Sequence, residues 1–135
     1  MDNKILRLYE GDEIVQKIIE YCDKNNIPSA WIWGIGAVSQ ASIAAFELET
    51  KKYHRKDFNE PLEIGNLTGN IGKLDGKTVA HLHIVLSNLG FDKTFTGHLD
   101  KAIVAATCEI CVMPLEEKII RELDNEIGLN LIKPQ

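Results

Sequence analysis

The sequence contains no long apolar run and few cysteines, and each absence excludes a class of protein. No stretch approaches the roughly 18 to 20 apolar residues that a helix needs to span a bilayer, so we expect no transmembrane segment. The first residues lack the long apolar core of a secretory signal peptide. Three cysteines, an odd number, do not make a disulfide framework. These absences predict a cytoplasmic protein with reduced thiols.

Basic charge is also scarce. The chain has 15 Lys and Arg residues against 20 Asp and Glu residues, which gives a net charge of −5. Because contacts with phosphate supply most non-specific affinity for nucleic acids, this balance disfavours direct DNA binding. The one basic cluster, residues 51–56, lies in what we expect to be a polar connection over residues 51–61. The 135 residues, 44% hydrophobic and 26% charged, otherwise suit one soluble globular domain spanning residues 1–135.

Residues 12–25 carry the pattern of an amphipathic helix. Ile14, Ile18 and Cys22 recur at helical spacing, and Pro28 prevents the helix from continuing. Acidic and basic residues alternate around a few apolar ones over residues 115–127, which predicts a short C-terminal helix or a loop. One main helix and a short second one are therefore expected.

Segments that are rich in β-branched residues, or that alternate apolar and polar residues, predict the strands. They are expected at Lys4–Tyr9, Ser29–Val38 with a tight turn at Gly34–Ala37, Ala41–Glu49 (whose alanines also permit a helix), Leu62–Ile71, Lys77–Ser87 and Ala102–Pro114. The Asp75-Gly76 pair indicates a hairpin turn. The predicted fold class is α+β: a mostly antiparallel β-sheet packed with one main α-helix and a short C-terminal helix, in a compact single domain.

Three of the four histidines lie within eighteen residues, between positions 81 and 98. His81 and His83 are two apart in an apolar, branched run, so as strand residues they share one face. His98, after Gly97, is expected on a nearby loop. Three imidazole ligands that leave the fourth coordination position open are typical of catalytic zinc sites. The alternative is that these histidines pack in the core or at the surface and bond to backbone carbonyls.

A zinc site that activates water also needs a general base. Glu63, on the facing strand of the hairpin, and Asp100, beside His98, are the candidate carboxylates. Spacing fixes the role of neither.

Other patterns are weaker. Cys108 and Cys111 have the spacing of a redox or zinc motif, but in a strand they point to opposite faces and cannot share an ion. Gly34 and Gly36 lack the third glycine of a dinucleotide fingerprint, so we expect them to permit close backbone approach. Trp31 and Trp33 are expected to share a strand face in the core or at a subunit interface.

The order of motifs resembles the PPC (plant and prokaryote conserved) domain, which in land plants follows AT-hooks in nuclear proteins. The residues that carry the resemblance are Leu6–Ile14, Ser29-Ala30, Gly34–Val38, Leu67–Gly72, His81–His83, Gly97–Leu99 and Glu109-Ile110. It covers about residues 4–115 and leaves 116–135 as a C-terminal extension. The resemblance implies a homotrimer whose histidines, here His81, His83 and His98, form a metal site, with zinc as the expected ion, near the subunit interface.

The sequence departs from its relatives in two respects. It contains no Arg-Gly-Arg-Pro core of an AT-hook, so the DNA-binding role of the plant proteins has no physical basis here. Thr96 replaces a glycine of many prokaryotic members, and Asp100-Lys101-Ala102 replaces an acid–glycine pair, so the segment that carries His98 is expected to differ in shape. Two functional alternatives stay open: a DNA-associated or protein-interaction module without catalysis, and a metal-dependent hydrolase or lyase acting on a small molecule at the trimer interface.

Overall fold

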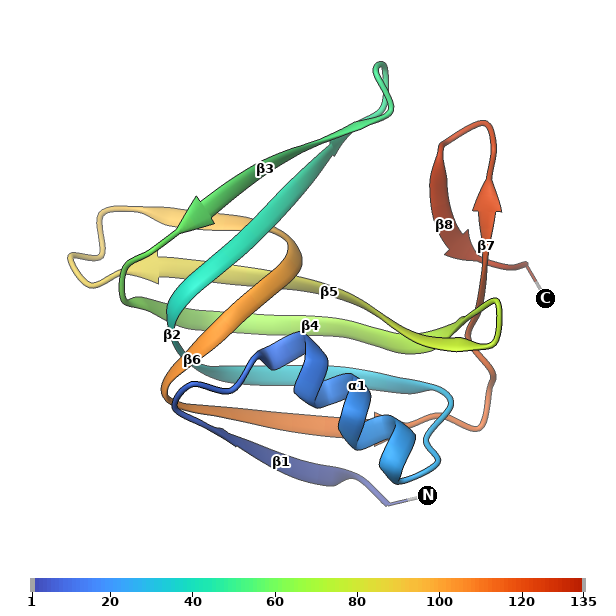
Figure 1. Cartoon of the computed structure of the whole chain (residues 1–135), viewed down its shortest axis with the longest axis horizontal. Coiled ribbons are helices and arrows are strands. Elements are labelled where there is room, and N and C mark those ends of the chain that lie inside the picture. The colour runs from blue at the N-terminus through green and yellow to red at the C-terminus, as the bar shows by residue number, and fades with distance from the viewer. Residues whose placement is uncertain (1, 135) are drawn as a thin grey trace.

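A computed structural model describes residues 2–134 and arranges them as eight strands and one helix (Figure 1). The elements are β1 (Lys4–Tyr9), α1 (Ile14–Lys24), β2 (Ala30–Glu47), β3 (Lys52–Phe58), β4 (Leu62–Leu74), β5 (Lys77–Asn88), β6 (Thr94–Pro114), β7 (Ile120–Asp124) and β8 (Leu129–Ile132). The α+β class, the main helix and the β4–β5 hairpin are confirmed. No helix in residues 2–134 is long and apolar enough to cross a bilayer.

The sheet closes on itself because β2 has partners on both of its sides. β2 pairs with β6 and with β4, while β5 joins β4 to β6, so these four strands form a ring. β2 and β6 are 18 and 21 residues long, and irregularities in their register let them bend from one side of the ring to the other. All pairings are antiparallel except a short parallel one between β4 and β7.

The helix α1 contributes its apolar side to the core. Ile14, Ile18 and Cys22 are fully buried. The helix begins at Ile14 because the Glu13 carboxylate accepts hydrogen bonds from the N–H groups of Val15 and Gln16. The same carboxylate accepts a bond from the N–H of Ala102 in β6, which ties the start of the helix to the sheet.

The prediction of a short C-terminal helix is wrong. β7 and β8 form a hairpin there, at the right of Figure 1. The chain leaves β6 and inserts Ile119 against β4, where the Lys73 N–H donates to the Ile119 carbonyl. The Asp124 carboxylate then accepts from the N–H groups of Glu126 and Ile127 and shapes the turn. These tertiary contacts outweigh the local helical preference of the charged residues.

Two further predictions need correction. Residues 51–61 are not only a connection, because residues 52–58 form β3, which pairs with the second half of β2 and projects as an arm in Figure 1. The turn expected at Gly34–Ala37 is a continuous part of β2. Close approach at Gly36 is confirmed. A Cβ there would lie 2.3 Å from the Thr107 carbonyl oxygen, so only glycine lets the backbones of β2 and β6 lie this close together.

Candidate metal centre

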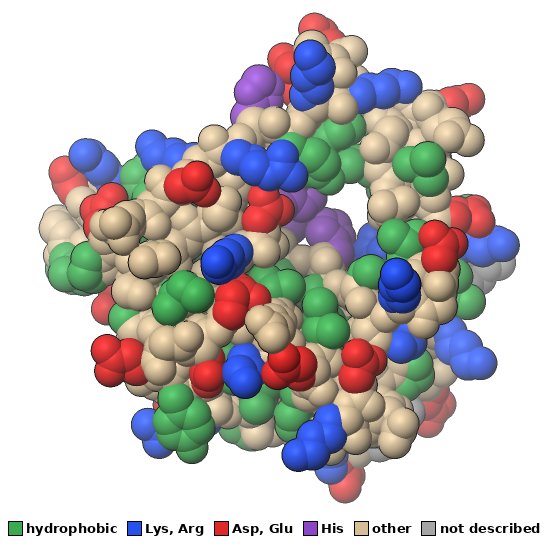
Figure 2. Space-filling view, viewed as in Figure 1, with side chains coloured by type: hydrophobic (Ala, Val, Ile, Leu, Met, Phe, Trp, Pro, Cys, Tyr) green, Lys and Arg blue, Asp and Glu red, His purple; other side chains and the backbone are tan. Residues whose placement is uncertain are grey.

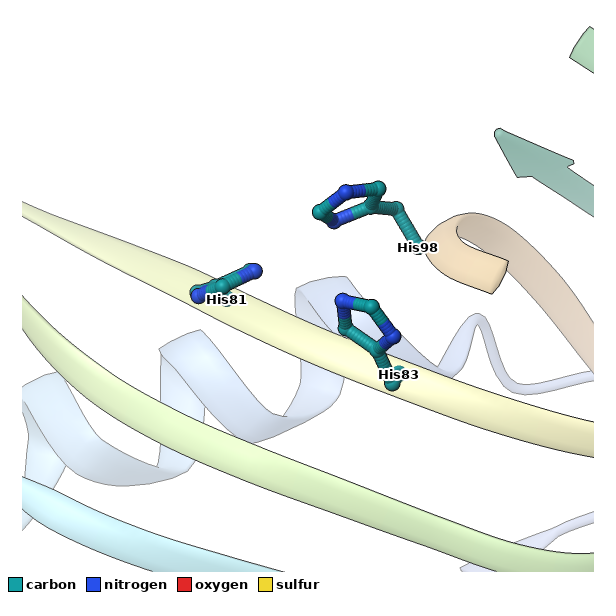
Figure 3. Close-up of side chains that lie close together, drawn as sticks. All are labelled: His81, His83 and His98. Carbon is teal, nitrogen blue, oxygen red and sulfur yellow. The ribbon is translucent and has the colours of Figure 1, made fainter. Parts of the chain in front are cut away.

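The structure brings His81, His83 and His98 together on the outer face of the ring (Figure 3). Alternation along β5 turns Leu82 and Ile84 into the core, so the two histidines point outward. His98 pairs directly opposite His83 in the β5–β6 register. It therefore lies in strand β6, and the expectation that a loop carries it is wrong.

The distances between the ring nitrogens of the three imidazoles are slightly longer than those in a bound metal site. One nitrogen from each ring lies within 4.8 Å of the other two. Three nitrogens separated by that limit lie about 2.8 Å from their common centre, whereas zinc binds imidazole nitrogen at about 2.0 to 2.1 Å. Side-chain rotations that move each nitrogen by about 0.7 Å would complete the set, so the residues fit such an ion.

A cavity of about 310 Å³ adjoins this cluster. Figure 2 shows histidine side chains at the base of a hollow between the β2–β3 arm and the β7–β8 hairpin. Its lining residues come from six strands: Tyr53 of β3, Leu74 of β4, Val79, Ala80 and His81 of β5, His98 of β6, Arg121 of β7, and residues 129–131 of β8. The volume is at the lower end of the range for small-molecule sites.

Arg121 enters the site from β7, and sequence reasoning missed it. Its Nη2 donates to the Asn70 Oδ1 at 2.7 Å and lies 3.2 Å from the Nδ1 of His81, and its Nη1 donates to the Asn130 carbonyl at 3.0 Å. Asn70 is the cross-strand partner of His81, so one guanidinium contacts both. In this arrangement Nδ1 of His81 is an acceptor, and metal binding by His81 requires Arg121 to release it.

The surroundings keep His81 and His98 uncharged near neutral pH. Burial lowers the pKa of His81 to about 4, assisted by the positive charge of Arg121 and by the two neighbouring histidines. Burial also lowers the pKa of His98, and His83 adds to the effect while Asp100 opposes it. Neutral imidazole is the form that binds metals, so this electrostatic environment suits ligation.

Acidification should destabilise the metal-free protein through His81. Its pKa is about 4 in the folded state and about 6.5 when exposed, so between these values the unfolded chain binds a proton that the folded chain does not. Stability is then fully present above pH 6.5 and is lost as the pH falls, by at most about 1.4 kcal/mol per pH unit. Urea unfolding of chelator-treated protein at pH 7, 6 and 5 measures the loss, and a His81→Gln variant should show a flatter profile. Equal slopes for the two proteins would refute this assignment.

The two carboxylates expected to act as a base do not join the cluster. Glu63 pairs with Ser87, four positions beyond His83, or about 13 Å along the strand. Asp100 lies at an irregularity of the β2–β6 register and accepts a hydrogen bond from the Nε of Arg55 at 2.9 Å. It is close enough to His98 to influence that pKa, but it is already paired with a cation.

The cysteine pattern behaves as a structural feature. Cys108 is fully buried while Cys111 is partly exposed, as expected for opposite faces of a strand, and all three cysteines are free. Burial raises the pKa of Cys108 to about 12 and that of Cys22 to about 11, which makes both thiols unreactive.

Comparison with known proteins points to one family. The sequence model of the Plants and Prokaryotes Conserved (PCC) domain matches residues 1–116, the family that the motifs resemble. No protein of curated function matches the chain in sequence.

Three solved structures are similar over nearly their whole length. A metal-containing protein of Archaeoglobus fulgidus is 36% identical, with a TM-score of 0.92 over 99% of this chain and 94% of that one. A candidate DNA-binding protein of Bacteroides thetaiotaomicron is 34% identical, with a TM-score of 0.92 over 97% and 91%. A plant- and prokaryote-conserved protein of Pyrococcus horikoshii is 30% identical, with a TM-score of 0.91 over 100% and 93%.

Proposed function

We propose, from the premise that the chain belongs to the Plants and Prokaryotes Conserved (PCC) domain family, that His81, His83 and His98 bind one zinc ion beside the cavity. The observation that carries the proposal is the convergence of one nitrogen from each ring to within 4.8 Å. The similar Archaeoglobus protein, described as containing metal, supports it. When bound by three histidines, zinc supplies a Lewis acid with an open coordination position.

The chain's own residues would determine how this centre works. The backbones of β5 and β6 fix His83 and His98 opposite each other, so the site is largely formed before an ion enters. Arg121 must release His81 when that imidazole binds the ion, and the hairpin that carries Arg121 covers one side of the cavity. A small molecule in the cavity would therefore meet the metal on one side and apolar side chains on the other.

Elemental analysis of protein purified without a histidine tag tests the metal directly. After supplementation with zinc and removal of unbound ion, we expect close to one equivalent of zinc per chain. A content below about a tenth of an equivalent of any transition metal would refute the proposal. The ligating imidazoles must be neutral, and burial lowers the pKa of His81 to about 4 and also lowers that of His98, so the affinity should fall as the pH is lowered toward 4. An affinity that is constant from pH 8 to 4 would contradict histidine ligation.

An exposed apolar patch supports self-association, which we propose produces a trimer. Ile5 of β1 and Trp33 and Ile35 of β2 remain 76%, 44% and 58% exposed on the two sides of β6, which pairs with both strands. Patches of large apolar side chains of this kind mark interaction sites. Sedimentation should give about three times the chain mass of 15.1 kDa, and Ile35→Glu should reduce it. A monomer at micromolar concentration would overturn the proposal.

Direct DNA binding receives less support from the described residues. Residues 52–56 of the basic cluster lie exposed in β3, but Arg55 pairs with Asp100 and His54 with Glu47. These pairs reduce the positive charge that phosphate contacts need. The DNA-binding description belongs to the Bacteroides relative and is not carried over to this chain.

A further inference from the structure

Arg121 is a buried cation without a counter-ion in residues 2–134. Its side chain belongs to a residue that is only 7% exposed, and its hydrogen-bond partners are an amide oxygen, a backbone carbonyl and an imidazole, all uncharged acceptors. No carboxylate among the described residues forms an ion pair with it, and its buried Nε has no partner. Burying a charge is costly unless an opposite charge compensates it.

The cavity beside Arg121 has the composition of a site for a small anion with an apolar body. Leu74, Val79, Leu129 and Leu131 contribute aliphatic walls, and no acidic residue lines it. We propose that this cavity binds a small monocarboxylate whose carboxylate is held by Arg121 and whose aliphatic part contacts these walls. The proposal deepens the proposed function by naming the ligand class of the same site, and it rests on that function only where the ligand also meets zinc.

The charge and shape of the site favour a monocarboxylate over phosphate. In the metal-free protein Arg121 is the one Lys or Arg residue in the lining, so a single negative charge balances it, whereas a phosphate dianion would leave an excess charge in the cavity. A guanidinium presents N–H donors in a planar fork that matches a carboxylate. Three of the five N–H groups of Arg121 face protein acceptors, which leaves two, including the Nε–H, without one.

A pair of isosteric probes tests the site. Isobutyrate and its neutral analogue isobutyramide would be titrated to 50 mM at constant ionic strength into ¹⁵N-labelled protein, once after chelator treatment and once with zinc. We expect isobutyrate to shift the Arg121 Nε–H signal and the amide signals of Ala80 and Leu131 saturably, and isobutyramide to cause no saturable shift. Inorganic phosphate should bind the chelator-treated protein at least tenfold more weakly than isobutyrate.

Variants separate anion binding from a purely structural role for Arg121. Arg121→Met should weaken isobutyrate at least tenfold, and Arg121→Lys, which keeps the charge, should retain part of the affinity. Because Arg121 also links the hairpin to β4, the amide spectrum of residues 120–132 checks that the hairpin is intact. If it is lost, the comparison of acid and amide on the unaltered protein decides. Absence of isobutyrate binding, equal binding of isobutyramide, or phosphate binding to the chelator-treated protein as tight as that of isobutyrate would overturn the proposal.

The same titrations keep the two proposals distinguishable. If the protein never retains zinc but isobutyrate still binds the chelator-treated form through Arg121, the metal proposal fails and the carboxylate site stands. If zinc binds in one equivalent and isobutyrate does not bind in either form, the carboxylate site alone is refuted.

Discussion

Replacing His83 with alanine is expected to lower the affinity for zinc at least 100-fold. The substitution removes one of three proposed ligands, whereas loss of a group that merely orients a ligand already costs about 10- to 100-fold. The His83 side chain is exposed and its ring centroid lies 4.3 Å from that of His98, so it contacts the cluster more than the core. The free energy of unfolding of the metal-free variant should therefore stay within about 0.5 kcal/mol of the parent protein. Competition with a chromophoric chelator measures the affinity.

His54→Ala is the matched control for this experiment. His54 is an exposed histidine on β3, where its ring bonds to the Glu47 carboxylate at 3.1 Å, and it takes no part in the cluster. Its removal should leave the zinc affinity unchanged. A His83→Ala protein that binds zinc as tightly as the His54→Ala protein would refute the assignment of His83.

Local sequence rules predict the positions of His81 and His83 better than that of His98. His81 and His83 follow from strand alternation, which depends only on neighbouring residues. His98 could be grouped with them by its nearness in the sequence and by the family resemblance, but its place opposite His83 depends on how β6 pairs with β5. The expected loop around His98 is a strand because β6 begins at Thr94 and continues without interruption through the irregularities that bend it.

The C-terminal segment shows where sequence reasoning stopped. Residues 115–127 have the mixed charges of a solvated helix, and nothing local indicates that Ile119 will insert against β4. Arg121 was overlooked for the same reason, since a buried arginine is rare and its partners Asn70 and His81 lie far away in the sequence. The alternation of buried Ile119, exposed Ile120 and buried Arg121 exists only in the folded structure, because Ile-Ile-Arg does not alternate apolar and polar residues.

Gly69→Ala should destabilise the fold by about 3 kcal/mol or more and weaken the site with it. A Cβ at Gly69 would lie 2.0 Å from the carbonyl oxygen of His81, and the residue has a φ of +153°, which other side chains rarely adopt. β4 cannot move aside, because at this position it is paired with β5 on one side and β2 on the other. The substitution must therefore displace the backbone that carries His81.

Gly65→Ala, in the same strand, separates this clash from the general effect of adding a methyl group to β4. A Cβ at Gly65 would approach only Val85, at an ordinary 3.9 Å, so the change should cost less than about 1 kcal/mol. Urea unfolding of the two metal-free variants compares their stabilities, and chelator competition compares their zinc affinities. Equal stabilities would show that β4 and β5 can separate at Gly69. The position of His81 would then depend on its contact with Arg121 rather than on the close approach of the two strands, because that hydrogen bond is the other interaction that fixes its ring.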